Sequence, residues 1–195
     1  MNSICVFCGA SAGDNPVYRA AATEMGSLLG KSGLELVWGG GHVGLMGVVA
    51  DAAVSASGHV WGVIPAFMEA RELAYRIDPA APGSAELLSV DSMHTRKAAM
   101  AARADAFVAM PGGFGTMDEL FEILTWAQLG LHDKPVGLLN TQGFFNPLIA
   151  MVEHMRAEGF VKAQHADLIH IADTPQALLA SLRTAFDARS KAPDA

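Results

Sequence analysis

The sequence predicts a single-domain α/β fold, in which a mainly parallel sheet of about seven strands is doubly wound and flanked by helices. Short apolar segments alternate with longer segments of helical periodicity along the whole chain, which is the pattern of a parallel sheet with crossover helices. The chain has 195 residues, no internal repeat and no interior linker that marks a second domain. A core of that size needs neither disulfides nor a structural metal.

Seven apolar segments have the length and composition of buried strands. They are Ile4–Cys8, Leu34–Trp38, Val60–Ile64, Leu87–Val90, Ala106–Met110, Val136–Leu139 and Leu168–Ile171. Helical spacing marks segments between them, at Tyr18–Leu29, Leu45–Ser55, Arg96–Ala104, Glu119–Leu129 and Phe145–Arg156. A last helix is expected after Thr174, because Pro175 suits the first helical position. We therefore expect a Rossmann-like domain over residues 1–189 and a disordered tail over residues 190–195, which lack an apolar pattern.

The charge balance disfavours several classes of partner. Lys and Arg together number 13 against 20 Asp and Glu, and the net charge is -7. Such a chain is not expected to bind nucleic acid or an anionic membrane surface. Residues 1–9 show no basic region ahead of their apolar residues, and no later apolar run approaches the roughly 20 residues of a membrane span. We expect a cytoplasmic protein that holds any anionic ligand locally.

Cys5 and Cys8 form a C-x-x-C pattern, which occurs in metal and redox sites. On a buried strand, however, residues three apart point to opposite faces and cannot share one ligand. No second Cys/His pair stands at zinc spacing, and no H-E-x-x-H pattern occurs. We expect two free thiols, no catalytic metal and no cofactor.

The loops that follow the strands are the candidate site, because ligands of parallel sheets bind beyond the carboxyl ends of the strands. The loop Pro111–Thr116, P-G-G-F-G-T, follows a buried strand and opens a helix. Amides at the start of a helix have no intrahelical partner and can bind an anion, and glycines allow the anion to approach. A tight turn that binds nothing would use glycine in the same way.

A second glycine-rich loop, Gly39–Gly44, formally matches the dinucleotide fingerprint G-x-G-x-x-G. That fingerprint requires an acidic residue about 20 residues on, at the end of the next strand. Here the next strand ends at Pro65, and the nearest acid, Glu69, lies beyond the proline. Two glycine-rich loops at one sheet edge fit a single mononucleotide better than NAD or FAD, with one loop near the phosphate and the other near the sugar or base.

Arg96 and Lys97 lie in the first turns of the helix that follows Asp91 and Ser92. Cations at this end oppose the helix dipole, so local stability does not explain them and a function is favoured. Arg96 could make bidentate contacts to a phosphate or a base edge. Lys97 points about 100° away round the helix and is either a second ligand contact or a solvated side chain.

Glu119 has two interpretations. Thr116–Glu119, T-M-D-E, is a capping box in which the carboxylate would fold back onto the Thr116 amide. Alternatively the carboxylate lies beside the anion-binding loop, near the sugar of a bound nucleotide. Glu122, one turn further on the same face, is then a candidate second carboxylate.

These motifs resemble the Lonely Guy family of cytokinin riboside 5'-monophosphate phosphoribohydrolases, which are often mislabelled lysine decarboxylases. The family's paired motifs, P-G-G-x-G-T-x-x-E and M-H-x-R-K, stand here at Pro111–Glu119 and Met93–Lys97. The resemblance extends from Ile4 to about Leu182. Small departures occur at Ala10, Trp38 and Thr95, where the family usually has Ser, Tyr, and Glu or Gln.

The resemblance implies a homodimeric enzyme that hydrolyses the N-glycosidic bond of a cytokinin riboside 5'-monophosphate or AMP, without a cofactor. Its products would be the free base and ribose 5-phosphate. The resemblance also implies that Arg96 and Glu119 form the catalytic pair. Together with the loop chemistry it places substrate contacts at Gly9, Ser11, Gly40, Gly41, Glu72, Met93, Arg96, Lys97, Gly112, Gly113, Gly115, Thr116, Glu119, Glu122 and Thr125.

Cleavage of this bond builds positive charge on the ribose, which a carboxylate such as Glu119 can stabilise or relieve by activating water. Arg96 would hold the phosphate or orient the departing base. The alternative is a carrier that binds a nucleotide or a molybdopterin-type cofactor without turnover, but binding a phosphate gives no reason to place a carboxylate nearby. A pyridoxal-phosphate lysine decarboxylase would need a Schiff-base lysine in a large site, and only Lys97 lies near the loops.

Overall fold

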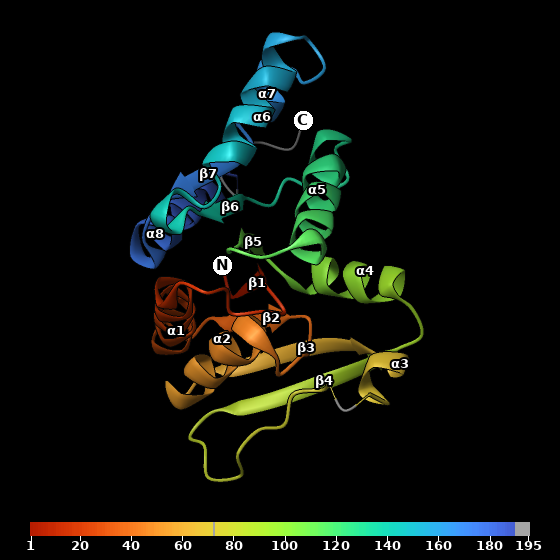
Figure 1. Cartoon of the computed structure of the whole chain (residues 1–195), viewed down its shortest axis with the longest axis vertical. Coiled ribbons are helices and arrows are strands. Elements are labelled where there is room, and N and C mark those ends of the chain that lie inside the picture. Colours follow the sequence, from red (N-terminus) through yellow and green to blue (C-terminus); the bar gives the residue numbers. More distant parts are fainter. Residues whose placement is uncertain (72, 190–195) are drawn as a thin grey trace.

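The computed structural model describes residues 1–71 and 73–189 (Figure 1). The strands are β1 Ser3–Phe7, β2 Glu35–Trp38, β3 His59–Pro65, β4 Ser84–Val90, β5 Ala106–Ala109, β6 Val136–Leu139 and β7 Ile169–Ala172. The helices are α1 Pro16–Lys31, α2 Gly44–Ser55, α3 Ala66–Glu69, α4 Met93–Arg103, α5 Phe114–Gln128, the 3-10 helix η1 Thr141–Gly143, α6 Asn146–Ala157, α7 Ala163–Ala166 and α8 Pro175–Arg189. The tail predicted for residues 190–195 lies outside the described residues.

The strands form one sheet in the order β4-β3-β2-β1-β5-β6-β7, and every neighbouring pair is parallel. The chain moves outward from β1 to β4 and then returns to the other side of β1 to begin β5. This reversal makes β1 and β5 the switch point of the sheet, where the loops that follow the two strands diverge. The predicted seven-stranded, doubly wound fold is confirmed.

Each face of the sheet is covered by its own set of helices (Figure 1). Side chains alternate along β1, so Ile4 and Val6 pack with α1, α2 and α8, whereas Cys5 and Phe7 pack with α4 and α5. Cys8 belongs to the first of these clusters, and both thiols are free. The prediction that the two cysteines point to opposite faces is therefore confirmed.

Backbone hydrogen bonds tie the switch-point loops to each other. Met110 donates its amide hydrogen to the Phe7 carbonyl at 2.8 Å, and Gly9 donates to the Pro111 carbonyl at 3.1 Å. The loop after β1 and the loop after β5 are consequently held side by side as they leave the sheet. In the described part of the chain, no helix has the length and apolar character needed to cross a membrane.

Candidate active site

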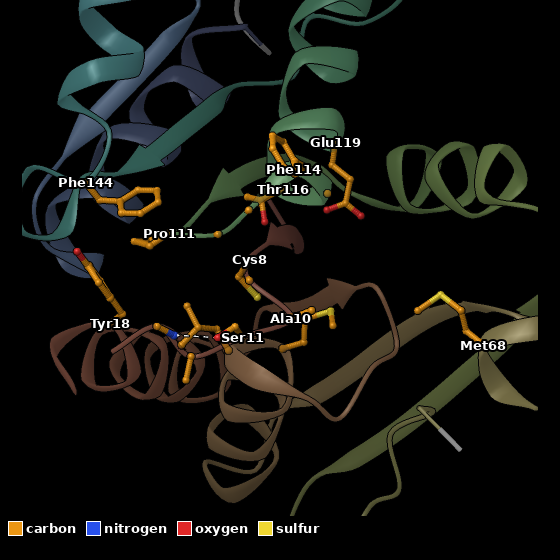
Figure 2. Close-up of a pocket in the computed structure, with 18 of the residues that line it drawn as sticks. Cys8, Ala10, Ser11, Tyr18, Met68, Pro111, Phe114, Thr116, Glu119 and Phe144 are labelled. Carbon is orange, nitrogen blue, oxygen red and sulfur yellow. Dashed lines mark hydrogen bonds between the residues drawn. The ribbon is translucent and has the colours of Figure 1, made fainter. Parts of the chain in front are cut away.

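A cavity of about 520 Å³ opens at the switch point, above the ends of β1 and β5 (Figure 2). The loop after β1, the loop after β5 and side chains of α1, α2 and α4 form its walls. Nine of the predicted contact residues line it: Gly9, Ser11, Met93, Arg96, Gly112, Gly113, Gly115, Thr116 and Glu119. The two sequence motifs are thus brought together although separate helices carry them.

The start of α5 presents a surface of uncapped backbone amides to this cavity. Gly113 occupies the N-cap position and offers no side chain to the amides of the first turn, so these amides remain available to an anion. A Cβ at Gly112 would lie 2.1 Å from Thr116 Oγ1 and 2.8 Å from the Gly9 amide nitrogen. Only glycine lets the two switch-point loops pack this closely.

Arg96 and Glu119 form a buried ion pair beside this surface. Arg96 Nη1 lies 3.1 Å from Glu119 Oε1, and the side chains are 8% and 9% exposed. Arg96 Nε also donates to the Val63 carbonyl at 3.1 Å, which ties the guanidinium to the end of β3. The pair is therefore held by α4, α5 and the sheet together.

The position of the first turn of α5 decides between the two interpretations of Glu119. The helix begins at Phe114 and is capped by Gly113, so Thr116 already lies inside it and is not its N-cap residue. The capping-box interpretation is wrong. The Glu119 carboxylate reaches across to α4 instead and faces the cavity.

Burial sets the protonation of the ionisable groups at the cavity. It raises the pKa of Glu119 to about 6, and the attraction of Arg96 opposes this rise only in part. Burial also raises the pKa of the Cys8 thiol, with the Glu119 charge adding to the effect. Cys8 is consequently a neutral thiol and not a reactive thiolate, whereas Glu119 is largely ionised at pH 7.

Several predicted contacts lie away from the cavity. Gly40 and Gly41 bind the segment after α3: Gly41 pairs with Ala74 in a β-bridge, and the Gly40 carbonyl accepts from the Tyr75 amide at 2.8 Å. Thr125 donates its hydroxyl to the Phe121 carbonyl at 2.7 Å. The substrate contacts predicted for these residues stay predictions, and Glu72 lies outside the described residues.

Lys97 and Glu122 also lie outside the cavity lining, because they bind each other. Lys97 Nζ lies 3.0 Å from Glu122 Oε1 and 3.0 Å from Asp118 Oδ2, and its side chain is 10% exposed. The alternative that Lys97 is a solvated side chain is therefore wrong. Contact of either residue with the substrate stays a prediction.

The structure adds residues that sequence reasoning missed. A Cβ at Gly39 would lie 1.8 Å from Arg96 Nη2, so only glycine leaves room for the guanidinium. The glycine-rich pattern of the second loop could have drawn attention to Gly39.

Tyr18 and Phe144 pack edge to face, with their ring centroids 5.7 Å apart, and Figure 2 shows them at one end of the cavity with Met68 near the other. No local sequence pattern marks Tyr18, Phe144 or Met68 as cavity residues.

Among residues 1–71 and 73–189, no group of three or more His, Cys, Asp and Glu side chains could hold a metal ion. The described polar groups of the cavity are instead backbone amides, one guanidinium, one carboxylate and hydroxyls. Such a set can bind an anion and can stabilise positive charge that develops next to it.

Comparisons with known proteins point to one family. A family model described as possible lysine decarboxylase matches residues 46–182. The chain is 45% identical over 179 residues to a probable cytokinin riboside 5'-monophosphate phosphoribohydrolase, LOGL2, of Oryza sativa subsp. japonica, over 92% of this chain and 71% of that protein. It is 44% identical over 179 residues to the cytokinin riboside 5'-monophosphate phosphoribohydrolase LOG1 of Arabidopsis thaliana, over 92% of this chain and 81% of that protein.

Solved structures with the same fold share less sequence. The molybdenum cofactor carrier protein of Chlamydomonas reinhardtii matches with a TM-score of 0.66 and 22% identity, over 95% of this chain and 98% of that chain. A molybdenum cofactor binding protein of Rippkaea orientalis matches with a TM-score of 0.66 and 21% identity, over 94% of this chain and 96% of that chain. At this identity the likeness shows the fold alone.

Gly39→Ala should displace Arg96 while the fold persists. The added methyl group would overlap the end of a flexible side chain, so we expect the guanidinium to leave Glu119 and the free energy of unfolding to fall by about 1–3 kcal/mol. A crystal structure and urea unfolding measure the two effects. Gly113→Ala is the control, because its Cβ would meet no atom within 4 Å. An unmoved Arg96 in Gly39→Ala would contradict this packing argument.

Proposed function

The chain belongs to the Lonely Guy family of cytokinin riboside 5'-monophosphate phosphoribohydrolases, and we propose that it hydrolyses the N-glycosidic bond of such a nucleotide or of AMP. The products are the free base and ribose 5-phosphate. The observation that carries the proposal is the buried pair of Arg96 and Glu119, which lies next to an open helix start in one cavity.

The phosphate of the substrate binds at the start of α5. The helix is 15 residues long, and its first turn lines the cavity at the positive end of the helix dipole. A local site of this kind lets a chain with a net charge of -7 hold an anion. Gly113 and Gly115 leave the surface open, because a Cβ at either position would meet no atom within 4 Å.

The order of groups along the cavity supports one direction for the bound nucleotide. Figure 2 shows Thr116, then Glu119, then Met68 in sequence from the aromatic end. With the phosphate at Thr116, the ribose lies at Glu119 and the base extends toward Met68. The side chains of Met46, Met68 and Met93 then contact the base, as flexible thioethers often contact aromatic rings.

Glu119 acts on the sugar, and Arg96 acts on Glu119 and on the departing base. When the bond between ribose C1' and the base breaks, its electrons leave with the base, and the ribose becomes positively charged. The ionised Glu119 carboxylate stabilises this charge or takes a proton from the water that adds to C1', and the departing base takes up the proton that the water loses. Arg96 holds the carboxylate in place, and its positive charge favours the base that leaves with extra electron density.

A carrier that binds a nucleotide or molybdopterin-type cofactor without turnover is the second candidate. Its support is the likeness to molybdenum cofactor carriers, which is at 22% identity and concerns the fold alone. A carrier gives no reason to keep a carboxylate buried next to the anion-binding helix start. The relatives that are 44–45% identical are named as hydrolases or probable hydrolases, which favours turnover.

We further propose that the protein is a cytoplasmic homodimer whose single domain spans residues 1–189. Apolar side chains stand exposed along α5 and the turn after it: Phe114 is 97% exposed, Leu129 66% and Leu131 68%. Exposed large apolar side chains along one helix are typical of a protein interface. Sedimentation should give the mass of two chains, and cell fractionation should place the protein in the cytoplasm. A single-chain mass at micromolar concentration would contradict the dimer.

The wild-type protein should release base from AMP or from isopentenyladenosine monophosphate. Glu119→Gln and Arg96→Ala should each lower kcat/KM by at least about 100-fold while the fold is kept, because each removes charge stabilisation at the reacting atoms. Chromatography of the released base measures this, with Glu153→Gln as the matched control, since that carboxylate is exposed on α6. Tight binding of both nucleotides without release would instead support the carrier.

Activity should rise with pH through about 6. The Glu119 carboxyl has its pKa raised to about 6, so it is protonated and inactive below that pH and ionised and active above it. Since a substrate phosphate also titrates near pH 6, the carboxyl is best followed in the free protein by ¹³C NMR. The resonance missing in Glu119→Gln identifies it. Base release that becomes faster as the pH falls below 6 would indicate that Glu119 works as an acid instead.

A further inference from the structure

A second ion cluster joins the same two helices, α4 and α5, as the pair of Arg96 and Glu119. Lys97 follows Arg96 on α4, but its side chain leaves the helix in a different direction and reaches Asp118 and Glu122 of α5. Both contacts are 3.0 Å long, and the Lys97 side chain is 10% exposed. Lys97 does not line the cavity. Two consecutive cations of α4 therefore bind the same stretch of α5 from two sides.

The charges around Glu119 do not balance. Arg96 and Lys97 act on it from α4, Asp118 and Glu122 lie beside it on α5, and the buried thiols of Cys5 and Cys8 lie near it on β1 and the loop that follows. Burial raises the pKa of both thiols, so they carry no charge at neutral pH. Three carboxylates thus share two cations. Loss of Lys97 would leave three carboxylates with one cation.

The carboxylate of Glu122 depends on Lys97 as the partner of its charge. Its Oε2 atom is buried and accepts no hydrogen bond in the described part of the chain, while Oε1 binds Lys97. A carboxylate in this position depends strongly on its cation, because a buried charge without a partner is costly. Partial burial opposes the charge on Lys97, but hydrogen bonds to Asp118 and Glu122 raise the pKa of the amine, which stays charged.

We propose that Lys97 is a positioning residue that fixes α5 against α4 and limits the negative charge around Glu119, and that it does not bind the nucleotide phosphate. This inference rests on the proposed hydrolase function. It differs from the family resemblance, which places Lys97 among the substrate contacts. The two roles predict different kinetics.

The two roles differ in which kinetic constant changes when Lys97 is replaced, KM or kcat. Removal of a group that binds the phosphate equally in the ground state and transition state raises KM and leaves kcat unchanged. Removal of a positioning residue misplaces Glu119 and raises its pKa, which lowers kcat at neutral pH and moves the acidic limb of the pH profile upward. KM then changes little, because none of the groups that we assign to the phosphate is removed.

The test compares Lys97→Met with Lys97→Arg, which keeps the charge, and with Lys31→Met, which removes an exposed lysine at the end of α1. In Lys97→Met we expect kcat at pH 7 to fall about 10- to 100-fold and KM to stay within about 2-fold. The Glu119 carboxyl resonance should titrate about one pH unit higher. Lys97→Arg should restore both quantities in large part, and Lys31→Met should match the wild type.

Two further variants make the result decisive. Glu122→Gln in the Lys97→Met background should bring the Glu119 titration back toward the wild type, because it removes the excess negative charge. If Lys97→Met does not fold, Glu122→Gln alone tests the same idea with the opposite sign, since it should lower the pH at which Glu119 titrates.

A raised KM with unchanged kcat and an unmoved Glu119 titration in Lys97→Met would overturn the proposal and make Lys97 a substrate contact. An unmoved titration in Glu122→Gln would overturn it as well. Failure of the hydrolase proposal is a separate result, because the wild type would then release no base. The titration of Glu119 in the free protein would still report the effect of Lys97 on this carboxyl.

Discussion

The site depends on keeping one carboxylate, that of Glu119, buried against one guanidinium at the switch point of the sheet. A buried charge without a partner would cost several kcal/mol, so the neighbouring structure has to hold Arg96 in a single position. The Val63 carbonyl accepts from Arg96 Nε, and the missing side chain at Gly39 leaves room for Nη2. Burial and the nearby carboxylates of Asp118 and Glu122 then raise the pKa of Glu119 to about 6. This value is close to neutral pH, where a catalytic carboxyl can change its charge.

Sheet topology explains why an anion site and a carboxylate meet in one cavity. The strand order places β1 beside β5, so the loops after them leave the sheet together and frame the cavity. α5 starts in this frame and presents its free amides at the first turn, and Glu119 follows Thr116 by three residues on the same helix face. In the proposed mechanism one helix therefore positions both the phosphate and the carboxylate that we assign to the sugar, and α4 adds the cations.

Structural features that depend on residues close together in the chain could be predicted from the sequence. The strands, most of the helices and the glycine loop before α5 follow from local periodicity and from the freedom of glycine. Local rules could not decide Glu119, because T-M-D-E fits a capping box equally well until Gly113 is known to cap the helix. Lys97 was ambiguous, and Gly39 was missed, because their partners lie on other elements. No local pattern revealed that Gly40 and Gly41, which we predict to contact the substrate, also bind the segment after α3.

The most direct test of this account is a crystal structure of Glu119→Gln with AMP bound. We predict that the phosphate lies on the amides at the start of α5, that ribose C1' faces position 119, and that the base extends toward Met68. A phosphate bound to Arg96, with the base at the start of α5, would contradict the assignment of the two ends of the cavity. The phosphate, and not ribose C1', would then lie beside the carboxylate.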